Sequence, residues 1–212
     1  MTREHPLWPG IRTGIPFAAA ALLVGISFGV VAKPIMGAAA AIAMSTFVFA
    51  GAAQFGATAV LAAGGDAVTA IAAGAMLNAR FLPMGIAVSR VLKGGPLRRA
   101  MEGQTIVDAS WAAAHEGGGQ FNREMLIGAT IPQYAAWVAG TVIGVLGADH
   151  IGDPKALGLD AVFPAFFVGL LLSEATASRA ARLTALTGAL IAFALTPLLP
   201  AGLPILLASS RP

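Results

Sequence analysis

The stretch AGAMLNARFLPMG, residues 73–85, places an asparagine, an arginine and a proline inside a run of Ala, Ile, Met, Leu and Val. The run extends over residues 67–88, and a helix of that length, at about 1.5 Å per residue, crosses a hydrocarbon core of about 30 Å. Asn78 and Arg80 lie near its middle. A mid-membrane arginine costs on the order of 2.5–3.5 kcal/mol. The sequence therefore predicts that Arg80 faces a cavity or a partner.

The composition supports a membrane setting for this run. Of the 212 residues, 57% are hydrophobic and 11% are charged, whereas soluble domains carry about 25% charged residues. The net charge is +3, but the basic residues lie at the ends of apolar runs and do not form a nucleic-acid-binding face. The chain has no cysteine, which excludes disulfides and thiol chemistry. We expect the lipid bilayer, and no nucleic acid, as a partner.

The long apolar windows predict an all-α, polytopic membrane protein with about six transmembrane helices in a single domain, 1–212. Turn-forming residues such as Gly, Pro and Asp separate the windows. Prolines in the last window indicate a kink or a short, broken seventh helix. The predicted spans are 14–32, 38–63, 67–88, 125–148, 157–178 and 183–207.

Lysines and arginines in the short loops predict the orientation. With six crossings, segment 89–123 is a cytoplasmic loop, and eight basic residues lie inside against four outside. This arrangement places both termini outside, although Arg3 and Arg12 disagree with it. Within the loop, residues 105–116 predict a helix that is too short to span and lies at the interface or re-enters the membrane.

Several polar side chains fall inside the predicted spans. Phe47, Gln54 and Thr58 share one stripe of the second span, and Gln133 lies on a similar stripe of the fourth. Such residues either hold helices together or line a path for a solute. Both readings stay open for the two glutamines.

Arg80 allows two readings as well. Pro83 removes a backbone hydrogen bond just beyond it, so the helix can break there. Broken helices near the midplane are where many secondary transporters bind substrate, and Arg80, oriented by Asn78, would then hold a carboxylate. Alternatively, Arg80 pairs with Asp108 or Asp160 to lock the bundle, or snorkels to the interface. The two aspartates are themselves either proton carriers or solvated caps.

No enzyme motif is evident. The histidines lack metal-ligand spacing, and the match of GISFG to Gly-x-Ser-x-Gly lies inside an apolar span. We therefore expect no catalytic residues, no metal and no cofactor. The rhythm of residues 52–66 returns in 134–149, which fits a three-plus-three inverted repeat.

Four segments of the sequence carry a family resemblance. GIPFAAAALLVGISFGVVA, FVFAGAAQFGATAVLAAG, LNARFLPMG and LGLDAVFPAFFVGLL resemble the AzlC/YgaZ family of bacterial branched-chain amino acid exporters, from about residue 12 to 200. The resemblance implies efflux of valine, leucine, isoleucine or analogues across the inner membrane, together with a small AzlD/YgaH-like membrane protein. By matching motif it draws attention to Gln54, Asn78, Arg80 and Asp160.

Two positions depart from the family pattern. Ala109 follows Asp108 where the family commonly has a second acid, and Phe81 follows Arg80 where histidine is frequent. The resemblance therefore implies no coupling role for Ala109 or Phe81.

Together these observations predict a secondary transporter, driven most simply by protons because no nucleotide-binding motif is present. Arg80 and Asn78 would meet the substrate carboxylate, and Gln54 and Gln133 would supply hydrogen bonds. Two rivals remain: a non-transporting membrane subunit, and a transporter of another small carboxylate solute. The remaining assignments are Phe47 and Phe167 for the aliphatic tail, and Asp108 and Asp160 for the protons.

Overall fold

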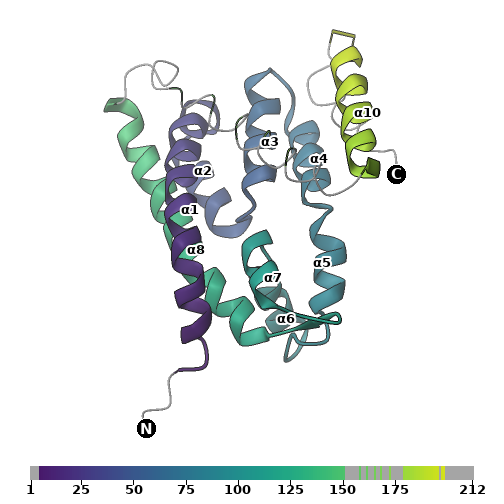
Figure 1. Ribbon diagram of the computed structural model, residues 1–212. Helices are drawn as coiled ribbons and strands as arrows, with labels where there is room; N and C mark the ends of the chain where they lie inside the picture. Colours follow the sequence, from purple (N-terminus) through teal and green to yellow (C-terminus); the bar gives the residue numbers. More distant parts are fainter. Residues whose placement is uncertain are drawn as a thin grey trace.

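A computed structural model describes residues 5–150, 158, 161, 165, 168, 172, 179–195 and 197–198. These residues are mostly helical, as Figure 1 shows. Two helices are each long and apolar enough to cross a membrane: α1 (Trp8–Met36) and α8 (Arg123–Gly147), the latter extended to His150 by the short helix η1 (Ala148–His150). The predicted all-α membrane class is thereby confirmed in outline, whereas the number of crossings is not.

Helices α1 and α8 pack closely and run in the same direction (Figure 1). Gly10, near the start of α1, faces Met125 near the start of α8, and Gly25 faces Trp137 further along. A Cβ atom at Gly25 would lie 2.6 Å from the carbonyl oxygen of Trp137, so only glycine permits this approach. Small residues at such interfaces let helix backbones meet in a bilayer.

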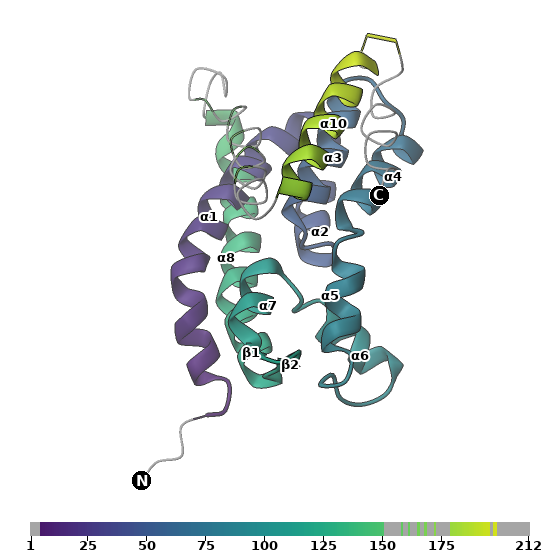
Figure 2. The ribbon, with the colours of Figure 1, turned by 45° about the vertical axis from the view of Figure 1, so that its right-hand side comes forward.

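The predicted second span, 38–63, is not one continuous helix. It forms α2 (Ala38–Phe47) and α3 (Gly51–Ala62), joined by a break at which Phe49 has a φ of 43°. Tyr134 hydrogen-bonds the end of α2, whereas Phe55 of α3 packs against Phe28, toward the other end of α1. The chain therefore reverses direction, and α2 and α3 form a helical hairpin (Figures 1 and 2). The window is mostly apolar and contains no proline, so neither its hydropathy nor a proline indicated the reversal.

The predicted third span is broken where the sequence indicated. Helices α4 (Ala67–Asn78) and α5 (Phe81–Val88) meet at a bend of 47°, with Ala79 and Arg80 between them. Asp66 caps the start of helix α4: its side chain accepts a hydrogen bond from the backbone N–H of Thr69 at 2.8 Å. The bend that positions Arg80 therefore lies within the predicted third span, between α4 and α5.

Segment 89–123 folds into short elements at one end of the molecule (Figure 2). They are α6 (Pro96–Gly103), α7 (Asp108–Ala114) and an antiparallel hairpin of β1 (His115–Gly117) with β2 (Gln120–Phe121). Helix α7 matches the short helix predicted near 105–116. The hairpin was not predicted, and Gly117, Gly118 and Gly119 make its turn with positive φ angles.

The helical hairpin changes the predicted topology. Because α2 and α3 return to the end at which α1 stops, the start of α1 lies at the same end of the molecule as segment 89–123 (Figures 1 and 2). The sequence analysis places these two parts on opposite sides of the membrane, whereas here they lie at the same end of the molecule. Helices α1 and α8 run parallel, whereas an inverted repeat would run the first helices of its two halves in opposite directions. Lys33 and Asp149 form an ion pair of 2.5 Å at the other end.

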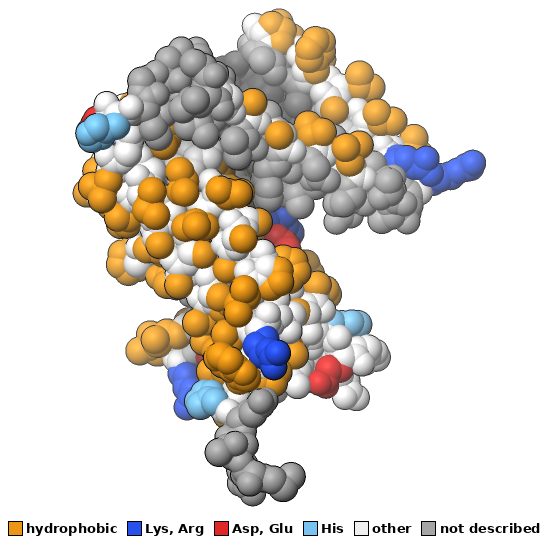
Figure 3. Space-filling view, turned by 60° about the vertical axis from the view of Figure 1, so that its left-hand side comes forward, with side chains coloured by type: hydrophobic (Ala, Val, Ile, Leu, Met, Phe, Trp, Pro, Cys, Tyr) orange, Lys and Arg blue, Asp and Glu red, His pale blue; other side chains and the backbone are white. Residues whose placement is uncertain are grey.

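The outer surface of α1 and α8 is apolar, as Figure 3 shows. Leu23 and Leu146, for example, are each 68% exposed. An exposed apolar band of this kind suits contact with lipid better than contact with water. Of the two remaining predicted spans, the second overlaps α10 (Arg179–Leu195), and most of 157–178 lies outside the described residues.

Candidate functional site

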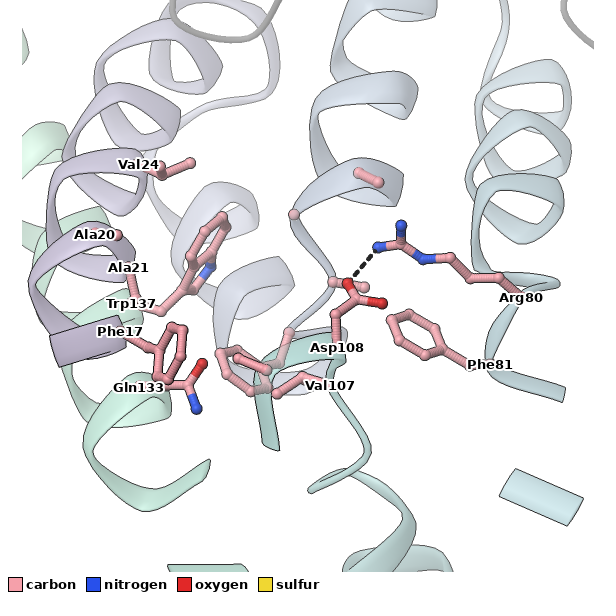
Figure 4. Close-up of a pocket in the computed structure, with 15 residues that line it drawn as sticks. Phe17, Ala20, Ala21, Val24, Arg80, Phe81, Val107, Asp108, Gln133 and Trp137 are labelled. Atoms are coloured by element: carbon pink, nitrogen blue, oxygen red, sulfur yellow. Dashed lines mark ion pairs between the residues drawn. The ribbon is translucent and has the colours of Figure 1, made fainter. Parts of the chain in front are cut away.

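A cavity of about 270 Å³ lies where the two helix breaks face α1, α7 and α8 (Figure 4). Its walls are almost entirely apolar. Among the lining side chains, Arg80 and Asp108 are charged and Gln133 carries an amide group. Such a surface, mostly apolar with a few polar groups, is typical of small-molecule sites. The lining residues are Phe17, Ala20, Ala21, Val24, Phe49, Ala50, Gly51, Ala52, Arg80, Phe81, Val107, Asp108, Ala109, Gln133 and Trp137.

Arg80 and Asp108 form an ion pair in this cavity. Arg80 lies at the bend between α4 and α5, Asp108 is the first residue of α7, and Nη2 is 2.9 Å from Oδ2. The two side chains keep 37% and 54% of their surface exposed, so both remain accessible to a ligand. The Nε atom of Arg80 is buried and has no hydrogen-bond acceptor among the described residues. The guanidinium also lies 5.1 Å from the centre of the Phe81 ring.

The tip of the helical hairpin forms another wall. Phe49, Ala50, Gly51 and Ala52 line the cavity, and α3 begins among them. The first N–H groups of a helix have no partner within it and carry a partial positive charge, which favours anions. Phe49 is a non-glycine residue with positive φ, a strained conformation that often occurs at binding sites.

Gln54 does not reach the cavity, although the sequence analysis named it as a substrate ligand. Its side chain is fully buried behind the hairpin tip. Its Oε1 accepts a hydrogen bond from the N–H of Ala50 at 3.2 Å, and its Nε2 donates to Ser45 Oγ at 2.9 Å. The amide therefore holds the tip of the hairpin together.

Gln133, the other glutamine named in the sequence analysis, does line the cavity. It is 7% exposed, and its Nε2 donates to the carbonyl of Ala129 at 2.7 Å. In Figure 4 it lies on the same side of the cavity as Trp137. Trp137 was not predicted as a site residue, but its position one turn after Gln133 on the same helix face was the signal for it.

Asn78 and Arg80 line different cavities. Asn78 lines a neighbouring cavity of about 260 Å³ together with Gln104 and Ile106. The Oδ1 atom of Asn78 is buried and has no partner among the described residues. Asn78, which the sequence analysis expected to act with Arg80 on a substrate carboxylate, therefore does not line the cavity that contains Arg80.

The other predicted site residues lie elsewhere. Phe47 is 74% exposed and is not part of the cavity. Asp160 and Phe167 lie outside the described residues. The described part of the chain holds no group of three or more His, Asp or Glu side chains that suits a metal ion.

A second ionic cluster lies outside the cavity, in segment 89–123. The buried carboxylate of Glu102 accepts hydrogen bonds from Arg123, from Arg98 at 3.1 Å and from the backbone N–H of Lys93 at 3.0 Å. These bonds, that of Arg123 above all, lower the pKa of Glu102 to about 2. The cluster ties α6 to the start of α8, and the sequence analysis did not identify it.

One family model matches this sequence: that described as AzlC protein, over residues 16–151. The matched range includes every residue that lines the cavity. No curated protein and no solved structure matches the chain.

Proposed function

The chain belongs to the AzlC family, which is associated with membrane transport, and we propose that it is a secondary transporter that exports branched-chain amino acids across the bacterial inner membrane. Valine, leucine, isoleucine or their analogues are the substrates. The observation that carries this proposal is the accessible Arg80–Asp108 ion pair inside an otherwise apolar cavity.

An aliphatic amino acid is complementary to this cavity. Its carboxylate would bind the guanidinium of Arg80, for which two parallel hydrogen bonds are the strongest arrangement, and the start of α3 would add a favourable potential. Its ammonium group would bind Asp108. A simple carboxylate or a simple amine would occupy only one charge of the pair and leave the other unpaired, which is costly in an apolar site.

The ion pair also suits a carrier that must move both loaded and empty. In the empty site the charges of Arg80 and Asp108 neutralise each other. In the loaded site the carboxylate of the zwitterion neutralises Arg80, and its ammonium group neutralises Asp108. As long as Asp108 is ionised, the cavity holds no net charge from these groups in either state, which keeps the cost of crossing the bilayer low.

We propose that the helical hairpin α2–α3 re-enters the membrane without crossing it. Helices α1, α4–α5 and α8 then cross, and windows 157–178 and 183–207 supply the remaining spans. Between residues 5 and 150, the basic residues Arg12, Arg90, Lys93, Arg98, Arg99 and Arg123 lie toward the end where α1 begins, while Lys33 lies at the other end. The positive-inside rule places the first end in the cytoplasm.

Coupling and partner complete the proposal. Export without a nucleotide-binding motif requires an ion gradient, and we assign this role to protons, with Asp108 and Asp160 as the carriers. The resemblance to the AzlC/YgaZ family supports a small AzlD/YgaH-like membrane protein as the partner.

The test is efflux of preloaded, labelled leucine, valine and isoleucine from cells that express the chain with and without an AzlD-like companion. Wild-type protein should accelerate efflux of these amino acids, and Asp108→Asn should abolish the acceleration at an unchanged protein level. Arg90→Ala is the matched control, since Arg90 is exposed and lies outside the cavity. If Asp108→Asn only lowers the amount of protein in the membrane, the ion pair is a structural lock and the chain is a non-transporting subunit.

A further inference from the structure

We propose that Trp137 sets the upper size limit for the substrate side chain and that Ser45 is the positioning residue that holds Trp137 in place. This inference rests on the proposed function, because it concerns the same cavity and assigns its apolar end.

Trp137 and the ion pair occupy opposite sides of the cavity. In Figure 4 the Arg80–Asp108 pair lies on one side, and Trp137 lies on the other, together with Val24, Ala20 and Ala21 of α1. An amino acid whose charged groups contact the ion pair must direct its side chain away from these charges. The apolar wall that includes the Trp137 indole is then the surface that the side chain meets.

The indole ring has little freedom to move aside. Its residue is 8% exposed, and its ring lies edge-on to Phe49, with ring centres 6.4 Å apart. The far edge of the ring touches the hairpin tip at Gly51, where an added Cβ atom would lie 2.8 Å from Cη2. The ring is therefore confined between α8 and the hairpin.

A buried hydrogen-bond network fixes the orientation of the ring. Trp137 Nε1–H donates to Ser45 Oγ at 3.2 Å, and Gln54 Nε2 donates to the same oxygen at 2.9 Å. Because these two donors occupy both lone pairs of Ser45, its own hydroxyl must donate to Thr141 Oγ1, 2.7 Å away. Thr141 in turn donates to the carbonyl of Trp137 at 3.0 Å.

Ser45 is thus the point at which the hairpin and the cavity wall are joined. It lies in α2, it is fully buried, and it does not line the cavity. Its removal would leave two buried donors, on Trp137 and Gln54, without an acceptor. Ser45 therefore affects selectivity only by fixing the position of the Trp137 indole ring.

The experiment compares efflux of leucine and phenylalanine by wild type, Trp137→Leu, Ser45→Ala and Ser45→Thr. Trp137→Leu should raise the phenylalanine-to-leucine rate ratio at least about tenfold, the lower limit of the selectivity that one methylene group provides in an apolar pocket. Ser45→Ala should raise it by less, and Ser45→Thr, which keeps the hydroxyl, should restore the wild-type ratio. Trp111→Phe is the control, because Trp111 packs against His115 and Phe121 and does not line the cavity.

An unchanged ratio in Trp137→Leu, with leucine efflux intact, would overturn the inference. If that variant does not fold, the double variant Trp8→Phe/Trp111→Phe leaves Trp137 as the remaining tryptophan. Its fluorescence should then change on addition of leucine and not on addition of phenylalanine, and the absence of a leucine response would also overturn the inference. The proposed function fails separately, if wild-type protein exports none of the branched-chain amino acids.

Discussion

Nη2 of Arg80 lies 2.9 Å from Oδ2 of Asp108, and each residue stands at an interruption of helical structure. Arg80 lies at the bend between α4 and α5, and Asp108 is the first residue of α7, after a non-helical connection. The hairpin tip at Phe49 lines the same cavity. Three irregular points of the backbone thus converge on one pair of charges, in an otherwise apolar interior.

The first prediction concerns the geometry of Arg80. Arg80→Ala should reduce leucine efflux to background, because Asp108 then lacks its counter-charge and the substrate carboxylate lacks its donor. Arg80→Lys keeps the charge but not the planar, bidentate fork, so we expect a residual rate about tenfold below wild type, which corresponds to about 1.4 kcal/mol. Rates are measured per amount of protein in the membrane. A wild-type rate for Arg80→Lys would show that charge alone is recognised.

The second prediction concerns the helical hairpin. The chain contains no cysteine, so single cysteines introduced at exposed positions report their side of the membrane through an impermeant thiol reagent. Ala38→Cys and Ala63→Cys should be labelled from the same, external side, whereas His5→Cys and Gln120→Cys should be labelled only after the cells are opened. Labelling of the cysteines at 38 and 63 from opposite sides would restore the single crossing that hydropathy predicts for 38–63.

The third prediction concerns the contact of α1 with α8. A Cβ atom at Gly25 would lie 2.6 Å from a backbone carbonyl of α8, so Gly25→Ala should force the helices apart at a cost of about 1–3 kcal/mol. The thermal midpoint in detergent should fall accordingly. Gly103→Ala is the matched control, because nothing lies within 4 Å of a Cβ atom there. Equal midpoints for the two variants would be incompatible with the close packing.

The fourth prediction concerns the pH dependence of the Glu102 cluster. Its pKa is about 2 in the folded protein and 4.5 in the unfolded chain, mainly because Arg123 hydrogen-bonds the carboxylate. A lowered folded pKa means that the stabilisation is fully present above pH 4.5 and is lost as the pH falls toward 2. Glu102→Gln should therefore lower the thermal midpoint at neutral pH.

The difference in thermal midpoint between Glu102→Gln and wild type should shrink as the pH falls below 4.5. Glu116→Gln is the control, since Glu116 is exposed and bonds only Asn122 among the described side chains. A midpoint difference that stays constant down to about pH 3 would contradict the assigned ion pairing.

The sequence by itself determined the setting and much of the secondary structure. Apolar length and the scarcity of charge are properties of local composition, and they are sufficient to predict membrane helices near 14–32, 67–88 and 125–148. Proline acts on its own helix, so the break beside Arg80 was also predictable. The need of Arg80 for a cavity or a partner followed from the cost of a charge in lipid.

Tertiary structure decided which groups meet. No proline marks the reversal at Phe49, and the strained backbone there is held by the contact of Phe49 with Trp137 of α8 and by the hydrogen bond from Ala50 to Gln54. Whether Gln54 and Gln133 contact a ligand or a neighbouring helix depends on which side chains surround them, and hydropathy does not contain that information. The same holds for the choice of Asp108 as the partner of Arg80. A charge in an apolar chain predicts that a partner exists, but only the packing of distant segments determines which residue it is.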